Sequence, residues 1–292
     1  MSATLEYDQR SLQHEQRMLN LYRHGSGSDG GLLQPLANAC WRASAFDWRI
    51  SADAGSIRRL WEEATRALAE GFVRKRAGFE CNHADLLLAL HLAIGTRNFQ
   101  LASSFMHTVS AVTSSTRSRN VARSPRLLLE GYILTVRAVV EHRKEHARAA
   151  QGLLHEAQAA LDHEWWREQF PSDGELAWKI TEHEAIRNLL SVIARLVLKQ
   201  TSGWEGNQSS DSDFDISICM EFVSLMDEVL LELDRFVDSE INHRPKLYFW
   251  LPGIALSILA ERAGLSLEWL QVRHEDNQAE YTRLPFNLVA VS

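Results

Sequence analysis

The class of fold follows from the stretch LLLALHLAIGTRNFQLASSFMHTVSAV, residues 86–112. Its first apolar run ends at Gly95, the residue type that most often terminates a helix, and a second apolar stripe begins at Phe99. Because apolar residues recur at helical spacing on both sides of this short polar break, the stretch predicts a helical hairpin.

The same pattern continues on either side of this hairpin. Upstream, one helix face precedes Gly71 and consists of Ile57, Leu60, Trp61, Ala64 and Leu68. Downstream, Ser124 followed by Pro125 predicts an N-cap and a first helical turn, and the segment from Ser172 to Glu175 fits a capping box. A later helix face consists of Phe222, Met226, Val229, Leu230, Leu233, Phe236 and Val237.

Together these helices predict an all-α bundle of stacked helical hairpins, which is repeat-like but lacks the regular tetratricopeptide period. A chain of 292 residues that is 45% hydrophobic can bury one large core, so we expect a single all-helical domain over residues 1–292. Within it we expect N-terminal helices and a linker in 1–52, a helical-hairpin core in 53–200, a polar loop in 201–213, and C-terminal helices and a tail in 214–292.

The first residues, the longest apolar run and the cysteines indicate the compartment of the protein. The first residues carry acids and amides where a secretory signal needs a basic start and an apolar core, and the longest apolar run, around Phe249 to Ala260, is too short to span a bilayer. Cys40, Cys81 and Cys219 are odd in number and far apart, which favours neither disulfides nor a thiolate zinc site. We expect a cytoplasmic protein without membrane association.

Catalytic motifs are weak in this sequence. HRKEH, from His142 to His146, matches the His-x-x-Glu-His pattern of inverted zinc peptidases, but it lies in a charge-rich passage where a hairpin turn is expected. Cys81, His83 and Asp85 are better interpreted as the start of a helix than as a metal cluster. We therefore expect no enzymatic activity, no catalytic residues, no metal and no cofactor. A hydrolase using His142, Glu145 and His146 is a distant alternative.

One connection is strongly basic. Arg117, Arg119, Arg123 and Arg126 fall in the segment TRSRNVARSPR, which contains no acid and could contact phosphate. No aromatic residue is interleaved with them, however, and the whole chain has a net charge of −7. An intramolecular or solvated role is commoner for such arginines, so we expect no direct binding of nucleic acid.

A second connection carries aspartates at every second position, Asp211, Asp213 and Asp215. A calcium loop of the EF-hand type beginning at Asp211 would need Gly at its sixth position and Glu at its twelfth, where Ile216 and Phe222 stand. This excludes that kind of calcium site. Asp213 or Asp215 could instead cap the helix that follows, but one cap does not require three aspartates.

The acids continue into that helix. Between Glu205 and Glu240 the segment holds eleven acids and one base, a charge of −10. On a helical wheel some of these acids share the outer stripe with Met220 and Leu231, which suggests an interaction surface. The predicted partner-binding residues are Asp211, Asp213, Asp215, Met220, Asp227, Glu228, Leu231, Asp234 and Asp238. Alternatively, another helix covers Met220 and Leu231, and the acids only solvate the remaining surface.

Three segments resemble a known family. The helix with Trp61 and Ala64 that ends in EGF (residues 70–72), the hairpin LLLALHLAIGTRNFQLASSF and the closing GLSLEWL resemble the all-helical immunity 49 family of bacterial polymorphic toxin systems, over about residues 55 to 270. The resemblance implies a cytoplasmic antidote that binds and neutralises a cognate toxin, often a nuclease, and it supplies no functional residues. The alternative is a helical-repeat scaffold for an endogenous protein partner.

Overall fold

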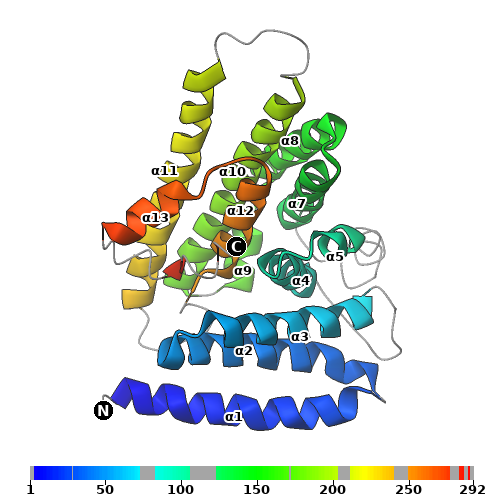
Figure 1. The fold of residues 1–292 in the computed structure, drawn as a ribbon, viewed down its shortest axis with the longest axis vertical. Coiled ribbons are helices and arrows are strands. Elements are labelled where there is room, and N and C mark those ends of the chain that lie inside the picture. The colour runs from blue at the N-terminus through cyan, green and yellow to red at the C-terminus, as the bar shows by residue number, and fades with distance from the viewer. Residues whose placement is uncertain are drawn as a thin grey trace. The chain divides into compact units, whose positions relative to one another are not determined.

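A computed structural model describes residues 3–27, 29–72, 83–105, 123–170, 172–202, 211–239, 249–276, 283–285 and 289. Every secondary-structure element within these ranges is helical, which confirms the predicted all-α class (Figure 1). None of the helices in these ranges is long and apolar enough to cross a membrane.

The chain divides into two compact units. Unit 1 comprises Met1–Ser118, His243–Ala255 and Asn287–Ser292, and unit 2 comprises Arg119–Asn242 and Leu256–Phe286. The division does not fall in the polar loop predicted at 201–213, because the helices on both sides of that loop belong to unit 2.

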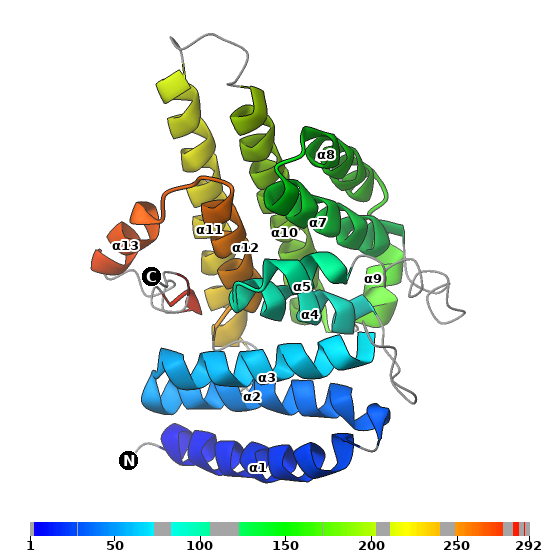
Figure 2. The same cartoon turned by 45° about the vertical axis from the view of Figure 1, so that its right-hand side comes forward.

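Unit 1 is built on three neighbouring helices, α1 (Ala3–Ser26), α2 (Leu33–Ser51) and α3 (Ala54–Phe72). They lie side by side, with α2 packed against both others, as both views show (Figures 1 and 2). The predicted hairpin follows as α4 (His83–Gly95) and α5 (Phe99–Ser104), and α4 packs against α3. The rest of its second stripe, after Phe105, lies outside the described residues.

Trp61 lies at the centre of unit 1 and is fully buried. Its Nε1 donates a hydrogen bond of 2.9 Å to Ser44 Oγ, so its polar atom keeps a partner inside the core. The centroid of its ring lies 5.5 Å from the centroid of the Phe249 ring. A Cβ atom at Gly95 would come within 3.2 Å of the Trp61 ring, so the glycine that ends α4 also allows close packing.

Unit 2 begins with a helical hairpin, α7 (Arg123–Glu141) and α8 (Lys144–Ala159), followed by the short α9 (His163–Gln169). The long α10 (Asp173–Ser202) packs against both arms of the hairpin. Its predicted capping residue is confirmed, because Ser172 Oγ accepts a hydrogen bond of 3.4 Å from the Glu175 backbone N–H.

The remaining helices are α11 (Asp211–Ser239), α12 (Leu251–Arg262) and α13 (Glu268–Glu275). α11 packs against α10, whereas α12 begins in unit 1 and ends in unit 2. The ends of α10 and α11 that face each other across residues 203–210 extend beyond the α7–α8 hairpin (Figures 1 and 2). The tail predicted as extended lies almost entirely outside the described residues.

Candidate partner-binding surface

The inner face of α11 is a continuous apolar stripe that holds this helix on unit 2. Six of its seven predicted core residues are buried, and the seventh, Val237, is half-buried. Phe236 stacks on Trp178 of α10 with ring centroids 5.8 Å apart. This contact and the buried stripe fix which face of α11 points outward.

The outer face of α11 leaves large apolar side chains in contact with solvent. Met220 is 64% exposed and Leu231 is 44% exposed, so no described helix of unit 2 covers them. Ile216, four residues before Met220, is 61% exposed. Sequence reasoning missed Ile216, although its spacing from Met220 places both side chains on one helix face. We call Ile216, Met220 and Leu231 the apolar stripe of α11.

Two of the predicted carboxylates are already paired within the chain. Arg273 Nη2 lies 2.6 Å from Asp227 Oδ2, and Arg283 Nε lies 2.8 Å from Asp234 Oδ1. Both aspartates remain partly exposed, at 34% and 31% of their side-chain surface. Local sequence patterns could not reveal these pairs, because the arginines follow their partners by 46 and 49 residues.

The other acids on this face differ in their surroundings. Glu228 is exposed and forms no ion pair with a described residue. Glu221 pairs with Arg195 of α10, and Glu232 pairs with Arg235 one turn further along α11. Both of these pairs are largely solvated, so they stabilise the fold weakly and leave the acids accessible.

The aspartates at the start of α11 do not cap it in the predicted way. The helix begins at Asp211, so Asp213 and Asp215 lie inside its first turns, and the prediction that one of them is the N-cap is wrong. The sequence misled because each of the three acids is an equally good capping residue. The side chains of Asp211, Asp213, Asp215 and Asp238 lie outside the described residues.

The His-x-x-Glu-His match falls in the turn between α7 and α8, as expected. His142 has a left-handed backbone with φ of 51°, and α8 begins only at Lys144, so the two histidines do not share a helix. His146 Nε2 lies 3.1 Å from Glu141 Oε2. A hydrogen bond from Arg137, together with the one from His146, lowers the pKa of Glu141.

The structure shows part of the basic connection. Arg123 pairs with Glu156 at 3.1 Å, and Arg126 lies 3.9 Å from Glu130. Arg117 and Arg119 lie outside the described residues. Both described arginines therefore lie near an acid of the same chain while their side chains stay 65% and 47% exposed.

A buried serine–histidine pair was not found from the sequence, because its members lie 59 residues apart. Ser124 is not the predicted N-cap, since α7 already begins at Arg123. Its hydroxyl instead donates a 2.6 Å hydrogen bond to the Ala157 carbonyl and lies 2.9 Å from His183 Nε2. Because the hydroxyl proton is used, His183 must donate to Ser124 and cannot act as its base.

This pair therefore ties helices together. Ser124 is fully buried and His183 nearly so, and the Trp166 ring lies 5.3 Å from the imidazole. Burial, with the nearby Arg187 charge acting in the same direction, lowers the pKa of His183 to about 4. The imidazole is thus neutral at physiological pH.

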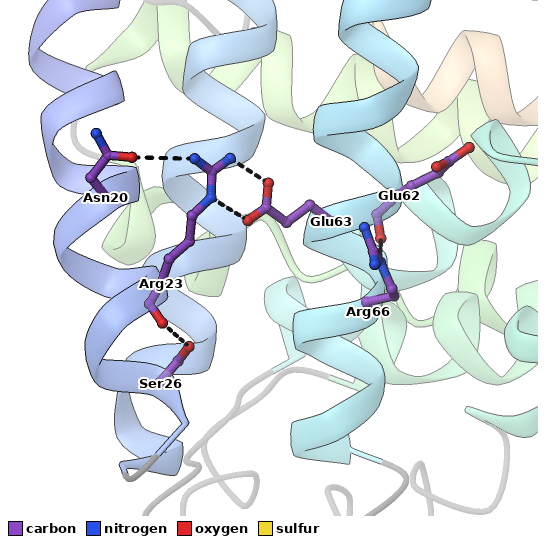
Figure 3. A network of polar contacts seen from close by, with 6 residues as sticks. All are labelled: Asn20, Arg23, Ser26, Glu62, Glu63 and Arg66. Atoms are coloured by element: carbon purple, nitrogen blue, oxygen red, sulfur yellow. Dashed lines mark hydrogen bonds and ion pairs between the residues drawn. The ribbon is translucent and has the colours of Figure 1, made fainter.

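A hollow of about 490 Å³ in unit 1 lies between α1 and α3. Arg23 crosses it and binds both oxygens of Glu63 at 2.6 Å (Figure 3). Burial, and then the Glu63 charge, raise the pKa of Cys40 to about 12, which keeps its thiol protonated and unreactive. Two acids, Asp47 and Glu63, and two arginines, Arg23 and Arg59, line the hollow.

Within the described residues, no three His, Cys, Asp or Glu side chains lie close enough together to hold a metal ion. No protein-family model, curated protein or solved structure matches the chain.

Proposed function

We propose that this chain is an immunity protein, which binds and neutralises a cognate antibacterial toxin through the outer face of α11. The observation that carries the proposal is the apolar stripe of α11, exposed among carboxylates on a helix whose core face already buries six large apolar residues. Helix stability does not require these apolar residues, whereas a protein interface does. The resemblance to the immunity 49 family supports the same role.

The charge around the stripe favours a basic partner. The segment from Glu205 to Glu240 carries a charge of −10, while the whole chain carries −7. A toxin that cleaves nucleic acid has a basic active site, since it must receive a polyanion. Clustered carboxylates would steer such a site toward α11 and exclude the substrate once bound, so a nuclease is the toxin class that fits best.

The apolar stripe would provide the contacts that slow dissociation. Side chains such as Met220 and Leu231 lose their water only when the partner is seated, so their effect appears mainly in the dissociation rate. Surrounding carboxylates act chiefly on the association rate and its dependence on salt. Occlusion of the toxin's active site then requires no catalytic residue in this chain.

A co-expression experiment tests the proposal. Cells expressing the toxin encoded beside this gene should survive when this chain is present and die with Met220→Asp/Leu231→Asp, which places charge in the contact. Leu21→Asp is a matched control, because Leu21 is an apolar residue of α1 with 61% exposure. Survival with the double variant, or equal loss with Leu21→Asp, would contradict the assignment of the surface.

A scaffold for an endogenous protein is the second candidate. It is favoured by the way in which helices pack against their neighbours in sequence, as in repeat proteins that present extended binding surfaces. Purification of the chain from its own cells distinguishes the two functions. A secreted toxin from the adjacent gene should co-purify with an immunity protein, whereas an unrelated cellular protein should co-purify with a scaffold.

A further inference from the structure

The acidic face of α11 already has a basic occupant in this chain. Arg273, in α13, pairs with Asp227, and Arg283, beyond α13, pairs with Asp234. The two aspartates are seven residues apart, so they lie two turns apart on nearly the same side of α11. We call Arg273 and Arg283, together with α13 and residues 283–285, the arginine clip.

The clip is a folded part of unit 2 with its own anchors. The Trp269 ring lies 5.8 Å from that of Phe222 in α11, and Leu270 is fully buried. His274 Nε2 lies 2.8 Å from the Leu284 carbonyl oxygen, and Leu284 is itself buried. The apolar anchors hold the backbone in place, so the arginine side chains could exchange partners without the segment leaving α11.

The clip binds the aspartates of α11 through guanidinium groups, as we expect a basic partner to do. Guanidinium groups bind carboxylates through charge-assisted hydrogen bonds, and Arg273 and Arg283 fill positions on Asp227 and Asp234 that a partner's arginines or lysines would seek. Both aspartates remain about one-third exposed, so an incoming cation can reach them. The Arg273–Asp227 pair, with side chains 29% and 34% exposed, contributes little to stability and can open readily, whereas Arg283 is 14% exposed and is held more firmly.

From this arrangement we propose that the clip is an intramolecular competitor. In the free chain Arg273 and Arg283 occupy Asp227 and Asp234, and a basic partner must displace them to use these carboxylates. The clip thus weakens the attraction of α11 for cations in general, while a partner that also covers the apolar stripe overcomes this competition. The inference rests on the proposed function only for the identity of the partner, because the competition itself concerns any cationic ligand.

Fluorescein-labelled hexa-arginine is a suitable probe, with binding measured by fluorescence anisotropy at low ionic strength. Arg273→Gln/Arg283→Gln should bind the peptide about 3- to 30-fold more tightly than the unaltered chain, because the two arginines no longer compete for Asp227 and Asp234. Arg148→Gln/Arg167→Gln makes the same change in net charge at exposed arginines of α8 and α9, and should alter affinity less than twofold. Equal tightening in both would show a general charge effect and overturn the proposal.

A thermodynamic cycle assigns the gain to these carboxylates. With Asp227→Asn/Asp234→Asn already in place, Arg273→Gln/Arg283→Gln should produce no further tightening beyond that of the charge control. A full gain in that background would overturn the proposal. If the double arginine variant loses its helical circular dichroism, Arg273→Gln alone carries the test, since Arg273 is the more exposed of the two, and tightening of about 2- to 5-fold is expected.

The co-expression experiment with the toxin and the binding experiment with the peptide distinguish failure of the proposed function from failure of the clip. If cells expressing the toxin die even with the unaltered chain but the peptide results hold, the proposed function is wrong and the clip remains. If cells survive with Met220→Asp/Leu231→Asp, the apolar stripe is not the toxin-binding surface. If the peptide binds all arginine variants alike while the apolar variants abolish protection, the clip is wrong and the proposed function remains.

Discussion

α3 and α11 are both amphipathic helices, but their outer faces differ in the side chains that they expose. α3 buries Ile57, Trp61, Leu68 and Phe72, and its exposed side chains, among them Arg59, Glu62 and Arg66, are polar. α11 buries its inner stripe equally well and yet leaves Ile216, Met220 and Leu231 exposed. Folding alone accounts for every large apolar residue of α3. It leaves the outer face of α11 unexplained, so that face is where a binding function should be sought.

The core of α3 provides the largest expected effect. Trp61→Ala should lower the free energy of unfolding by about 3–5 kcal/mol, because a fully buried indole is removed and a cavity remains. Urea denaturation followed by circular dichroism measures the change. Leu231→Ala in α11 is the matched comparison and should change the free energy of unfolding by less than about 0.5 kcal/mol. Similar losses for the two variants would remove the contrast between the helices.

The buried His183 gives the next largest expected effect on stability. In contrast to the exposed acids of α11 it is buried, and its burial makes the free energy of unfolding depend on pH. The folded pKa of His183 is about 4, below the ordinary value near 6.5, so the unfolded chain binds the proton first as the pH falls. The stability contributed by neutral His183 is complete above about pH 6.5 and is lost on going down to about pH 4, by roughly 3 kcal/mol. Urea titrations across this range measure the loss.

His183→Gln is the control for this prediction. Glutamine can still donate to Ser124 but does not titrate, so this part of the pH dependence should disappear. The groups around the imidazole include Arg187, Glu182 and the Trp166 ring, and none of them is changed by the substitution. An unchanged pH profile in His183→Gln would assign the acid sensitivity to another group.

Local patterns explain why much of the fold could be predicted. Gly95, the capping Ser172 and the inner stripe of α11 are encoded within a few turns of one helix, where spacing and residue type are enough. The Ser124–His183 pair and the arginine clip depend on which helices pack together, and no local pattern carries that information. On the candidate surface, the sequence pattern indicated the exposure of Met220 and Leu231, but it missed Ile216 and the partners of Asp227 and Asp234.

The bridge between α1 and α3 should have a smaller effect. Glu63→Gln removes the charge that Arg23 binds across the hollow (Figure 3), and because Arg23 is 44% exposed we expect a loss of only about 0.2–1 kcal/mol. Thermal unfolding measures the shift. Glu62→Gln, one residue away and exposed, should cause almost none. A loss above about 2 kcal/mol for Glu63→Gln would show that this ion pair stabilises unit 1 like a core contact.

The smallest expected effect on stability belongs to the apolar stripe of α11. Met220→Ala and Leu231→Ala should each change the free energy of unfolding by less than about 0.5 kcal/mol, because side chains that are 64% and 44% exposed lose little packing. In the complex with the toxin each should instead speed dissociation, by about tenfold or more if the contact is fully desolvated. Surface plasmon resonance on the immobilised toxin measures that rate. Unchanged dissociation together with a large drop in melting temperature would mean that these residues support the fold, and α11 would then resemble α3 after all.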